Sequence, residues 1–401
     1  MSDALRHAIQ GESRARGGVT SGERAGAKAG AKPHGGSAES VALVSPQRGR
    51  GARANASGRY EREAREPFDD GWDGLADLPA LKTHVTRETP RTIITRNDSP
   101  DISFDRSINP YRGCEHGCVY CFARPAHAYM GLSPGLDFET RLFVKDGAAA
   151  VLERELSAPR YQPRTIAIGT NTDPYQPIEK QHRVMRQTLE TLSRANHPVA
   201  IVTKSALVLR DLDILAPMAA KGLAKVALSV TSLDGKLSRL MEPRAAQPEK
   251  RLETLRALSE AGVPTGVMVA PVIPAINEQE IEAILARAHE AGAREAGYVM
   301  LRLPLEVEGI FSEWLLVHFP DRYRHVMSLV RGVRGVRGVR GGKAYDSTWG
   351  KRQTGSGPYA WMTGRRFELA AARLGLNQKR TKLRTDLFVR PSGPIAQLSL
   401  F

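Results

Sequence analysis

Short β-branched runs alternate with amphipathic stretches between residues 107 and 302, and this alternation limits the possible folds more than any other feature of the chain. The runs predict six strands, at residues 107–111, 165–169, 199–203, 225–230, 265–269 and 296–302. The stretches between them are of helical period; Met185, Leu189 and Leu192, for example, recur on one helix face. Six such repeats predict a parallel sheet with helices outside it, an α/β fold of the partial (β/α)6, TIM-like barrel type.

The helices expected within the repeats lie at residues 148–156, 179–195, 209–220 and 249–261, with one more beginning at Asn277. Asn277 is a good N-cap for that helix, because Glu280 follows three residues later. We also expect a small extra strand at residues 138–144. Beyond the barrel, helices are expected at residues 311–319, 321–330 and 361–374.

All three cysteines of the chain lie on one loop after the first expected strand, as Cys114, Cys118 and Cys121. The spacing is C-x3-C-x2-C. Three thiolates can hold three irons of a 4Fe-4S cubane, which normally takes four cysteines. The fourth iron would then lack a protein ligand, and an open coordination position is where a metal site does chemistry. Gly113 and Gly117 suit a loop that wraps closely around a bulky cluster.

Two other interpretations of these cysteines remain open. The first is a zinc site with His116 as the fourth ligand, although its place between the first two cysteines is poor for closing a tetrahedron. The second is a disulfide, which the odd cysteine count and the lack of a secretion signal disfavour.

With Tyr120 just before the last cysteine, the loop resembles the radical S-adenosylmethionine (SAM) superfamily. The motifs Arg-Gly-Cys-Glu-His-Gly-Cys-Val-Tyr-Cys and Asn-Thr-Asp-Pro-Tyr-Gln-Pro resemble most closely a bacterial group related to the DNA-repair enzyme spore photoproduct lyase, over about residues 101–302. The resemblance implies a 4Fe-4S cluster whose open iron is chelated by SAM. It implies reductive cleavage of SAM to methionine and a 5′-deoxyadenosyl radical, with electrons from a donor such as flavodoxin or ferredoxin. Spore photoproduct lyase returns a hydrogen atom from a separate cysteine, which this chain lacks.

The resemblance and the strand ends together suggest how SAM is held. Function in such barrels gathers at the carboxyl ends of the strands. The backbone carbonyls of Gly169 and Thr170, or the Asp173 carboxylate, are candidates for the SAM amino group, although a capped turn before a helix explains this stretch equally well. Lys204 is the candidate for the SAM carboxylate and Ser229 for the ribose or carboxylate, unless both are ordinary loop residues.

Aromatic and charged residues near the cysteine loop complete the list of candidates. Tyr120 and Phe122 are expected to pack on adenine. Polar residues that are candidates for substrate contacts are Arg124, His127, Tyr129, Glu242, Arg244 and Arg302. Of these, Tyr129 and Arg244 are our catalytic candidates.

Charge and composition divide the chain into four segments. Residues 1–60 are rich in Gly, Ala, Ser and Arg and are expected to be disordered. Residues 61–106 are expected as a lead-in outside the barrel, residues 107–305 as the radical SAM core, and residues 306–401 as a basic extension. Residues 330–401 hold 15 Lys and Arg against 3 Asp and Glu, which suggests a phosphate-bearing partner.

The extension contains two unusual stretches. Residues 330–341 repeat Val-Arg-Gly four times, and a Gly at every third position holds a helix poorly. The repeat is interpreted either as an Arg-Gly contact with nucleic acid or as a replication-slippage insert in a surface loop. The chain closes with Gln397, Leu398, Ser399, Leu400 and Phe401, which match the short motif that docks bacterial DNA polymerases and repair proteins on the sliding clamp. Gln offers hydrogen bonds and the apolar residues offer anchors for a preformed pocket.

The sequence thus predicts a radical SAM enzyme that acts on nucleic acid, with a DNA repair-like role. One alternative is a radical SAM enzyme that modifies tRNA, a peptide or a small molecule. A second is a non-enzymatic, metal-stabilised binding protein. No apolar run approaches the length of a membrane span, so we expect no membrane partner and a cytoplasmic location.

Overall fold

The computed structural model describes residues 49–61, 81–334 and 344–392, all of which belong to one compact unit, residues 44–401. The predicted clamp motif at residues 397–401 and most of the Val-Arg-Gly repeat lie outside these described residues. No helix in the described ranges is long and apolar enough to cross a membrane.

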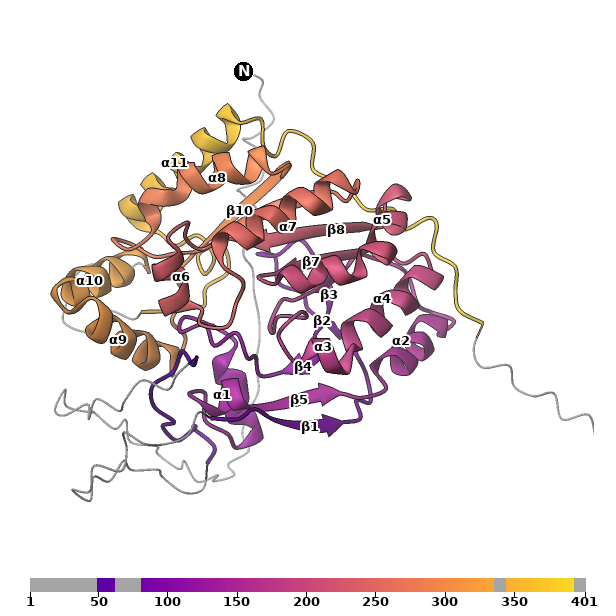
Figure 1. Cartoon of the computed structure of the whole chain (residues 1–401), viewed down its shortest axis with the longest axis horizontal. Coiled ribbons are helices and arrows are strands. Elements are labelled where there is room, and N and C mark those ends of the chain that lie inside the picture. Colours follow the sequence, from indigo (N-terminus) through magenta and orange to yellow (C-terminus); the bar gives the residue numbers. More distant parts are fainter. Residues whose placement is uncertain (1–48, 62–80, 335–343, 393–401) are drawn as a thin grey trace, which may run out of the picture. The chain divides into compact units, whose positions relative to one another are not determined.

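Seven strands form the main sheet of the described unit, in the order β10-β9-β8-β7-β6-β3-β2 (Figure 1). The six predicted strands are confirmed, and they pair in parallel with one another. They are β3 (Arg106–Ile108), β6 (Ile166–Ile168), β7 (Val199–Thr203), β8 (Ala224–Ser229), β9 (Thr265–Val272) and β10 (Glu295–Met300). The lead-in was expected outside the barrel, but its β2 (Ile94–Arg96) joins the sheet as an edge strand antiparallel to β3.

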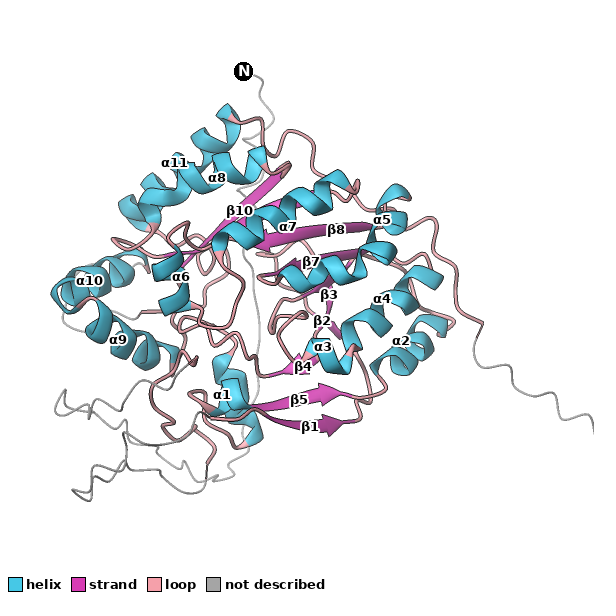
Figure 2. Ribbon diagram, in the orientation of Figure 1, coloured by secondary structure: helices cyan, strands magenta, loops and turns pink. Residues whose placement is uncertain are grey.

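Helices connect these strands as the alternation predicts, and Figure 2 shows α4, α5 and α7 in front of the strands. The connecting helices are α2 (Ala148–Ser157), α3 (Glu179–His182), α4 (Val184–Arg194), α5 (Leu212–Ala220), α6 (Gly235–Met241), α7 (Pro248–Glu260) and α8 (Ile281–Glu290). The helix expected at residues 179–195 is broken at Arg183, whose φ is 53°. The Glu179 carboxylate accepts a hydrogen bond from Met185 N at 3.0 Å and so begins a new helix.

A second sheet, in the order β1-β5-β4, lies next to the cysteine loop in the sequence. It contains β1 (His84–Glu88), β4 (Tyr111–Arg112) and β5 (Arg141–Lys145), with α1 (Asp137–Thr140) just before β5. The first predicted strand, 107–111, is therefore divided between the two sheets. The extra strand expected at residues 138–144 is confirmed as β5, shifted toward its end.

The C-terminal extension packs on the cysteine loop through a core of its own. It consists of α9 (Val307–His318), α10 (Tyr323–Val333) and α11 (Gly357–Arg373). Buried Val119 and Tyr120 of the loop cluster with Met241, Phe311 and Trp314. The Trp314 indole donates to Leu240 O at 3.1 Å. The cysteine loop therefore shares this second core with α9 and α10, whereas α11 packs in the core of the main sheet.

Three local expectations are corrected by the structure. Residues 330–333 of the Val-Arg-Gly repeat form the last turn of α10, because Val330 and Val333 are buried in the cores. Asn277 does not cap α8; its side chain bonds Ile273 N at 2.6 Å and the Thr231 carbonyl at 2.6 Å, and so ties β9 to β8. Residues 49–60 were expected to be disordered, yet Ala52 is buried.

The described part of the N-terminal segment is held by one buried carboxylate. Glu139 accepts hydrogen bonds from Gly51 N at 2.9 Å and Ala52 N at 2.8 Å, and it pairs with the buried guanidinium of Arg124. These polar contacts, which the low apolar content of residues 1–60 does not reveal, place residues 50–52 against the cysteine loop.

Candidate active site

A cavity of about 530 Å³ lies at the carboxyl ends of the main-sheet strands. It gathers ten of the predicted site residues, namely Cys114, Cys118, Cys121, Tyr120, Phe122, Gly169, Thr170, Asp173, Lys204 and Ser229. Its size is within the range of small-molecule and cofactor sites. Residues that the sequence did not single out line it too, among them Asn171, Met268, Arg352 and Gln353.

The cysteine loop is fixed by hydrogen bonds from three directions. Cys114 N donates to Phe138 O at 2.9 Å, and Val119 N donates to Met241 O at 3.0 Å. The Gln176 amide spans the loop: it accepts from Glu115 N at 2.9 Å and donates to the carbonyl of Gly113 at 3.2 Å. Gln176 is part of the Asn-Thr-Asp-Pro-Tyr-Gln-Pro motif, but only its contacts in the fold reveal this role.

Gly117 has the left-handed backbone that its place in the loop requires, with φ of 66°. A Cβ added there would lie 2.7 Å from Glu139 Oε2. A side chain at position 117 would therefore collide with the Glu139 carboxylate, which lies against the loop.

Asp173 lies in the cavity wall, but its carboxylate is already engaged. Its oxygens accept hydrogen bonds from Thr203 Oγ1 at 2.7 Å, Tyr175 N at 2.9 Å and Lys204 N at 2.8 Å, and His116 Nδ1 lies 3.4 Å away. Burial would raise the pKa of Asp173, but His116 and these hydrogen bonds outweigh it and hold the pKa well below its usual range. A carboxylate has about four acceptor positions. We therefore assign Asp173 to positioning the strand ends and not to binding the SAM amino group.

Lys204 follows β7 and is half-buried, with its Nζ 5.8 Å from the centre of the Tyr120 ring. Within the described ranges, no acceptor forms a hydrogen bond or ion pair with this ammonium group. Burial would lower the pKa of Lys204, but nearby Cys118 and Glu242 raise it, so the ammonium stays charged. Ser229, at the end of β8, donates from its hydroxyl to Ala270 O at 3.1 Å.

A buried ion pair supports Tyr120 behind the cavity. The Tyr120 hydroxyl donates to the Glu242 carboxylate, which also accepts from Thr231 Oγ1 at 2.7 Å and pairs with Arg251. Arg251 donates further to Ser229 O at 2.9 Å. Glu242, expected as a substrate contact, is instead fully buried and positions the aromatic ring beside the cysteines.

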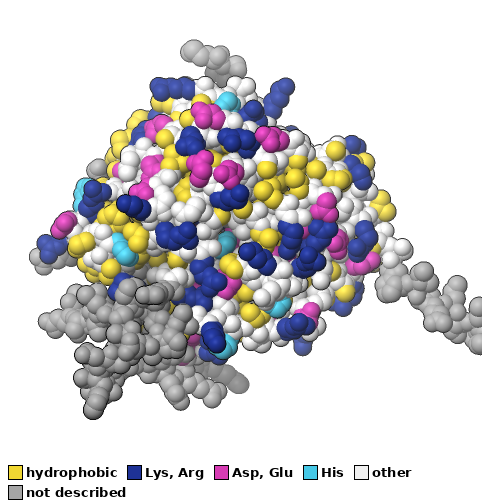
Figure 3. All heavy atoms as spheres, viewed as in Figure 1, with side chains coloured by type: hydrophobic (Ala, Val, Ile, Leu, Met, Phe, Trp, Pro, Cys, Tyr) yellow, Lys and Arg dark blue, Asp and Glu magenta, His cyan; other side chains and the backbone are white. Residues whose placement is uncertain are grey.

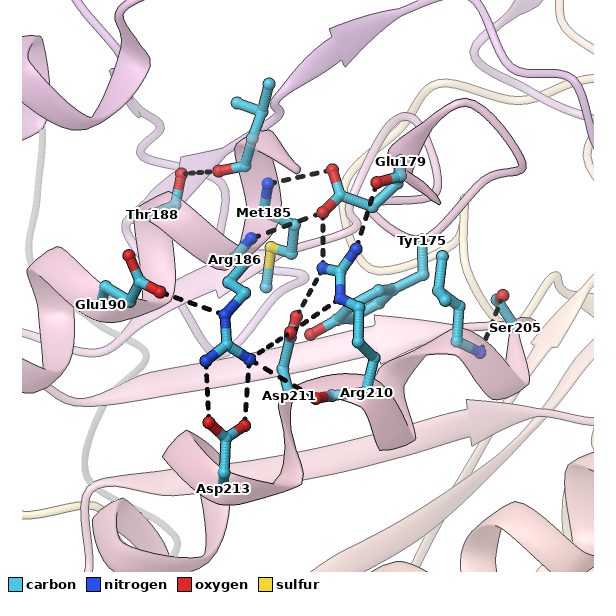
Figure 4. A network of polar contacts seen from close by, with 12 residues as sticks. Tyr175, Glu179, Met185, Arg186, Thr188, Glu190, Ser205, Arg210, Asp211 and Asp213 are labelled. Carbon is cyan, nitrogen blue, oxygen red and sulfur yellow. Dashed lines mark hydrogen bonds and ion pairs between the residues drawn. The ribbon is translucent and has the colours of Figure 1, made fainter. Parts of the chain in front are cut away.

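A second polar network anchors the loop that follows β6 (Figure 4). Arg210 pairs with Glu179 at 2.6 Å and with Asp211 at 2.8 Å. Arg186 joins Asp211 at 3.2 Å and Asp213 at 2.7 Å. The network ties the end of the 169–179 loop to the segment after β7, so the two strand ends that carry Gly169 and Lys204 are held together.

The cavity is bounded by a bridging segment from the C-terminal extension, residues 348–353. Gln353 O accepts from Met300 N at 2.9 Å at the end of β10, and Arg352 pairs with Asp101 at 2.6 Å before β3. Arg334 holds the segment, donating to Arg352 O at 3.0 Å and Met300 O at 3.0 Å. The two edges of the open barrel are thus connected beside the site.

The structure does not bring the two catalytic candidates into the cavity. Tyr129 is 72% exposed and stacks on Tyr60, with ring centres 5.3 Å apart, because the 3-10 helix Arg124–Met130 turns it outward. Arg244 pairs with Glu115 at 3.3 Å outside the cavity. Buried Arg124 and His127 are also structural: Arg124 pairs with Glu139, and His127 bonds Arg141 O at 2.9 Å. Of the six substrate candidates, Arg302 alone lines this cavity.

The donor set fits a cubane cluster better than a zinc ion. The three cysteines are free thiols that line the same cavity. In the described residues, no three His, Cys, Asp or Glu side chains are arranged to hold a single metal ion, and His116 faces Asp173 instead. A cubane presents a separate iron to each thiolate. Burial raises the pKa of the Cys118 thiol to about 12.

Sequence comparison gives clear relatives. The family model of the radical SAM superfamily matches residues 108–288. An uncharacterized protein of Mycobacterium tuberculosis is 38% identical over 230 residues, which are 56% of this chain and 68% of the relative. An uncharacterized protein of Methanocaldococcus jannaschii is 26% identical over 216 residues, 54% of this chain and 77% of the relative.

Solved structures share the fold. A mutant of spore photoproduct lyase has a TM-score of 0.53 at 16% identity, over 73% of this chain and 80% of that one. The same enzyme complexed with dinucleoside spore photoproduct has a TM-score of 0.52 at 16% identity, with the same coverage. Radical SAM proteins are enzymes whose cofactors are a 4Fe-4S cluster and SAM. The family match and the shared fold agree: this chain belongs to the radical SAM superfamily.

Proposed function

We propose that this enzyme binds a 4Fe-4S cluster through Cys114, Cys118 and Cys121 and carries out radical SAM chemistry on nucleic acid, in a DNA repair-like reaction. One observation carries the proposal: the three free thiols line the same cavity as the ammonium of Lys204, which pairs with no acceptor among the described residues. When bound, the cluster supplies the electron that cleaves SAM to methionine and an adenosyl fragment, which takes a hydrogen atom from the substrate.

The residues around the cavity divide the binding of SAM between them. Lys204 pairs with the carboxylate of SAM, as a charge-assisted contact in a partly buried site. The backbone carbonyls of Gly169 and Thr170 accept from its amino group, with the 169–179 loop fixed by the Arg210 network. Tyr120 packs near the adenine, and Ser229 lies within the same cavity wall. Phe122, the other aromatic candidate for the adenine, instead carries the Arg302 guanidinium 4.0 Å from its ring centre.

Two observations favour nucleic acid as the substrate. The extension that carries the bridging segment is strongly basic, with 15 Lys and Arg against 3 Asp and Glu in residues 330–401. The fold resembles that of spore photoproduct lyase, which has been solved with a dinucleoside spore photoproduct bound. Figure 3 shows Lys and Arg side chains interspersed with acidic ones on the face drawn there.

The C-terminal tail is proposed to dock on the bacterial sliding clamp through residues 397–401. After α11, the described chain runs past the amino ends of the strands (Figure 1). Asn377 N bonds Arg294 O and Val389 N bonds Ala195 O, each at 2.9 Å, just before β10 and β7 respectively. The described chain thus ends at the edge of the sheet opposite the cavity. Docking by the tail would leave the cavity free to meet DNA.

The test is anaerobic reconstitution followed by reduction with dithionite and measurement of 5′-deoxyadenosine. The account expects 5′-deoxyadenosine from the wild type, an increase with ultraviolet-damaged DNA over undamaged DNA, and none from Cys118→Ala. Release with tRNA or a peptide but not with DNA would replace the substrate and keep the chemistry. Zinc in place of iron, without SAM cleavage, would reject the enzyme and select the metal-stabilised binding protein.

A further inference from the structure

Four basic side chains line the cavity, and two of them already lie beside carboxylates. Arg352 pairs with Asp101 at 2.6 Å, and His116 lies 3.4 Å from Asp173. For Lys204 and Arg302, by contrast, no ion pair or hydrogen bond from the side chain is found within the described ranges. The cavity therefore contains two cationic side chains for which the described residues provide no anionic partner.

Arg302 is held in place without using its hydrogen-bond donors. It follows β10, is half-buried, and its guanidinium lies 4.0 Å from the centre of the Phe122 ring. A guanidinium stacked on an aromatic face keeps its N–H groups directed sideways, where a planar fork can bind a phosphate or carboxylate. Phe122 is 40% exposed and directly follows Cys121, so an anion on Arg302 lies beside the cysteine loop.

Lys204 and Arg302 reach the cavity from different strands. Lys204 follows β7 and Arg302 follows β10, with β8 and β9 between them in the sheet. SAM has one carboxylate and no other anionic group, and that carboxylate is assigned to Lys204. We therefore assign an anionic group of the substrate to Arg302.

We propose that Arg302 and Phe122 form a substrate subsite that binds a phosphodiester group and the adjoining base of a nucleic acid strand. This inference rests on the proposed function, and it names the residues by which the enzyme selects a nucleic acid strand as its substrate. Proteins that bind single-stranded nucleic acids combine basic and aromatic side chains in this way. A base stacks on the aromatic ring, and a neighbouring phosphate pairs with the cation.

One amide side chain completes the subsite. Gln353 lines the cavity, and no hydrogen bond of its side chain is found in the described part of the chain. Amides of this kind bind the polar edges of bases. Gln353 comes from the bridging segment, whose backbone pairs with Met300 at 2.9 Å. The C-terminal extension therefore contributes directly to substrate selection.

Arg302→Gln tests the subsite by fluorescence anisotropy of a labelled single-stranded oligonucleotide with the reconstituted full chain and SAM. The variant should bind about tenfold more weakly, and its salt dependence should fall by about 0.7 in the slope of log K against log salt, the loss of one phosphate contact. Arg302→Lys should give an intermediate affinity, because the charge remains and the planar fork is lost. Arg256→Gln removes an exposed arginine from α7 and should leave affinity and slope unchanged.

Two further measurements separate this inference from the proposed function. SAM affinity by calorimetry and SAM cleavage by dithionite without nucleic acid should match the wild type in Arg302→Gln. If the variant loses SAM affinity while its oligonucleotide affinity is unchanged, Arg302 belongs to the cofactor site and the inference is overturned. Competition by a thymidine monophosphate probe as effective as by the oligonucleotide would also overturn it, because the substrate would then be a small phosphate compound. Neither result bears on SAM cleavage by the wild type, which tests the proposed function separately.

Discussion

Replacing Glu242 by Gln should destabilise the protein by about 3–5 kcal/mol, the range for breaking a buried ion pair. Glu242 and Arg251 are 0% and 1% exposed in their side chains, so Arg251 would be left buried without a counter-charge. The glutamine can still accept from Thr231 and Tyr120, but its NH2 group would face the guanidinium. The charge, and not the shape, is what the variant removes.

The pKa of the Glu242 carboxylate gives a second estimate of this loss of folding stability. Burial would raise the pKa of Glu242, but Arg251 and Lys204 outweigh it and lower the pKa from 4.5 to about 2. This difference corresponds to about 3 kcal/mol. Because the pKa is lower in the folded state, the stabilisation is complete above about pH 4.5 and is lost as the pH falls toward about 2.

The assay is urea denaturation followed by circular dichroism, for wild type and Glu242→Gln, at pH 7 and at several values down to pH 2. The midpoints should differ strongly at pH 7 and converge as the pH approaches 2. Glu253→Gln is the matched control, since Glu253 is half exposed and pairs on the surface with Lys250 at 2.9 Å; its effect should stay below about 1 kcal/mol. A Glu242→Gln effect no larger than that of the control, or one that does not change with pH, would refute the reasoning.

Three further predictions concern the cofactor site, the backbone and the tail. Lys204→Ala should raise the Kd of SAM by about tenfold to a hundredfold without changing the circular dichroism, because one charge-assisted contact is worth about 1.5–3 kcal/mol. Calorimetry measures this Kd, and an unchanged value would contradict the role of Lys204. Gly169→Ala should lower the thermal midpoint by several degrees, because φ is 89° there and a Cβ would lie 2.0 Å from Val202 O; a midpoint equal to the wild type would contradict this. Deleting residues 397–401 should abolish binding to a bacterial sliding clamp in a surface-plasmon assay and leave 5′-deoxyadenosine release unchanged, whereas retained binding would remove the tail from the interface.

The six parallel strands and the position of the cysteine loop could be predicted because both depend on local sequence patterns. Apolar periodicity marks each strand and helix, and three clustered cysteines need no distant partner to be recognised. Lys204 and Ser229 could be predicted to line the cavity from the strand ends and the family resemblance together, since the carboxyl ends of parallel strands meet on one side of a barrel.

The features that could not be predicted from the sequence depend on contacts between residues that are far apart in the chain. Strand β2 has three residues, too few for any periodicity to appear. The polar residues Asp173, Glu242 and Asn277 look like binding or capping groups in sequence, but their partners come from other strands and satisfy them. Tyr129 was favoured for its closeness to the cysteines in sequence, and the turn at residues 124–130 carries it outside the cavity.

The most direct test of the central claim is electron paramagnetic resonance of the anaerobic, dithionite-reduced protein with and without SAM. The claim is that three cysteines hold a cluster with one iron open to SAM. The account predicts the signal of a reduced 4Fe-4S cluster that shifts when SAM is added and is lost in Cys114→Ala, Cys118→Ala or Cys121→Ala. A cluster signal that SAM leaves unchanged, or one that survives removal of any of these thiols, would contradict it.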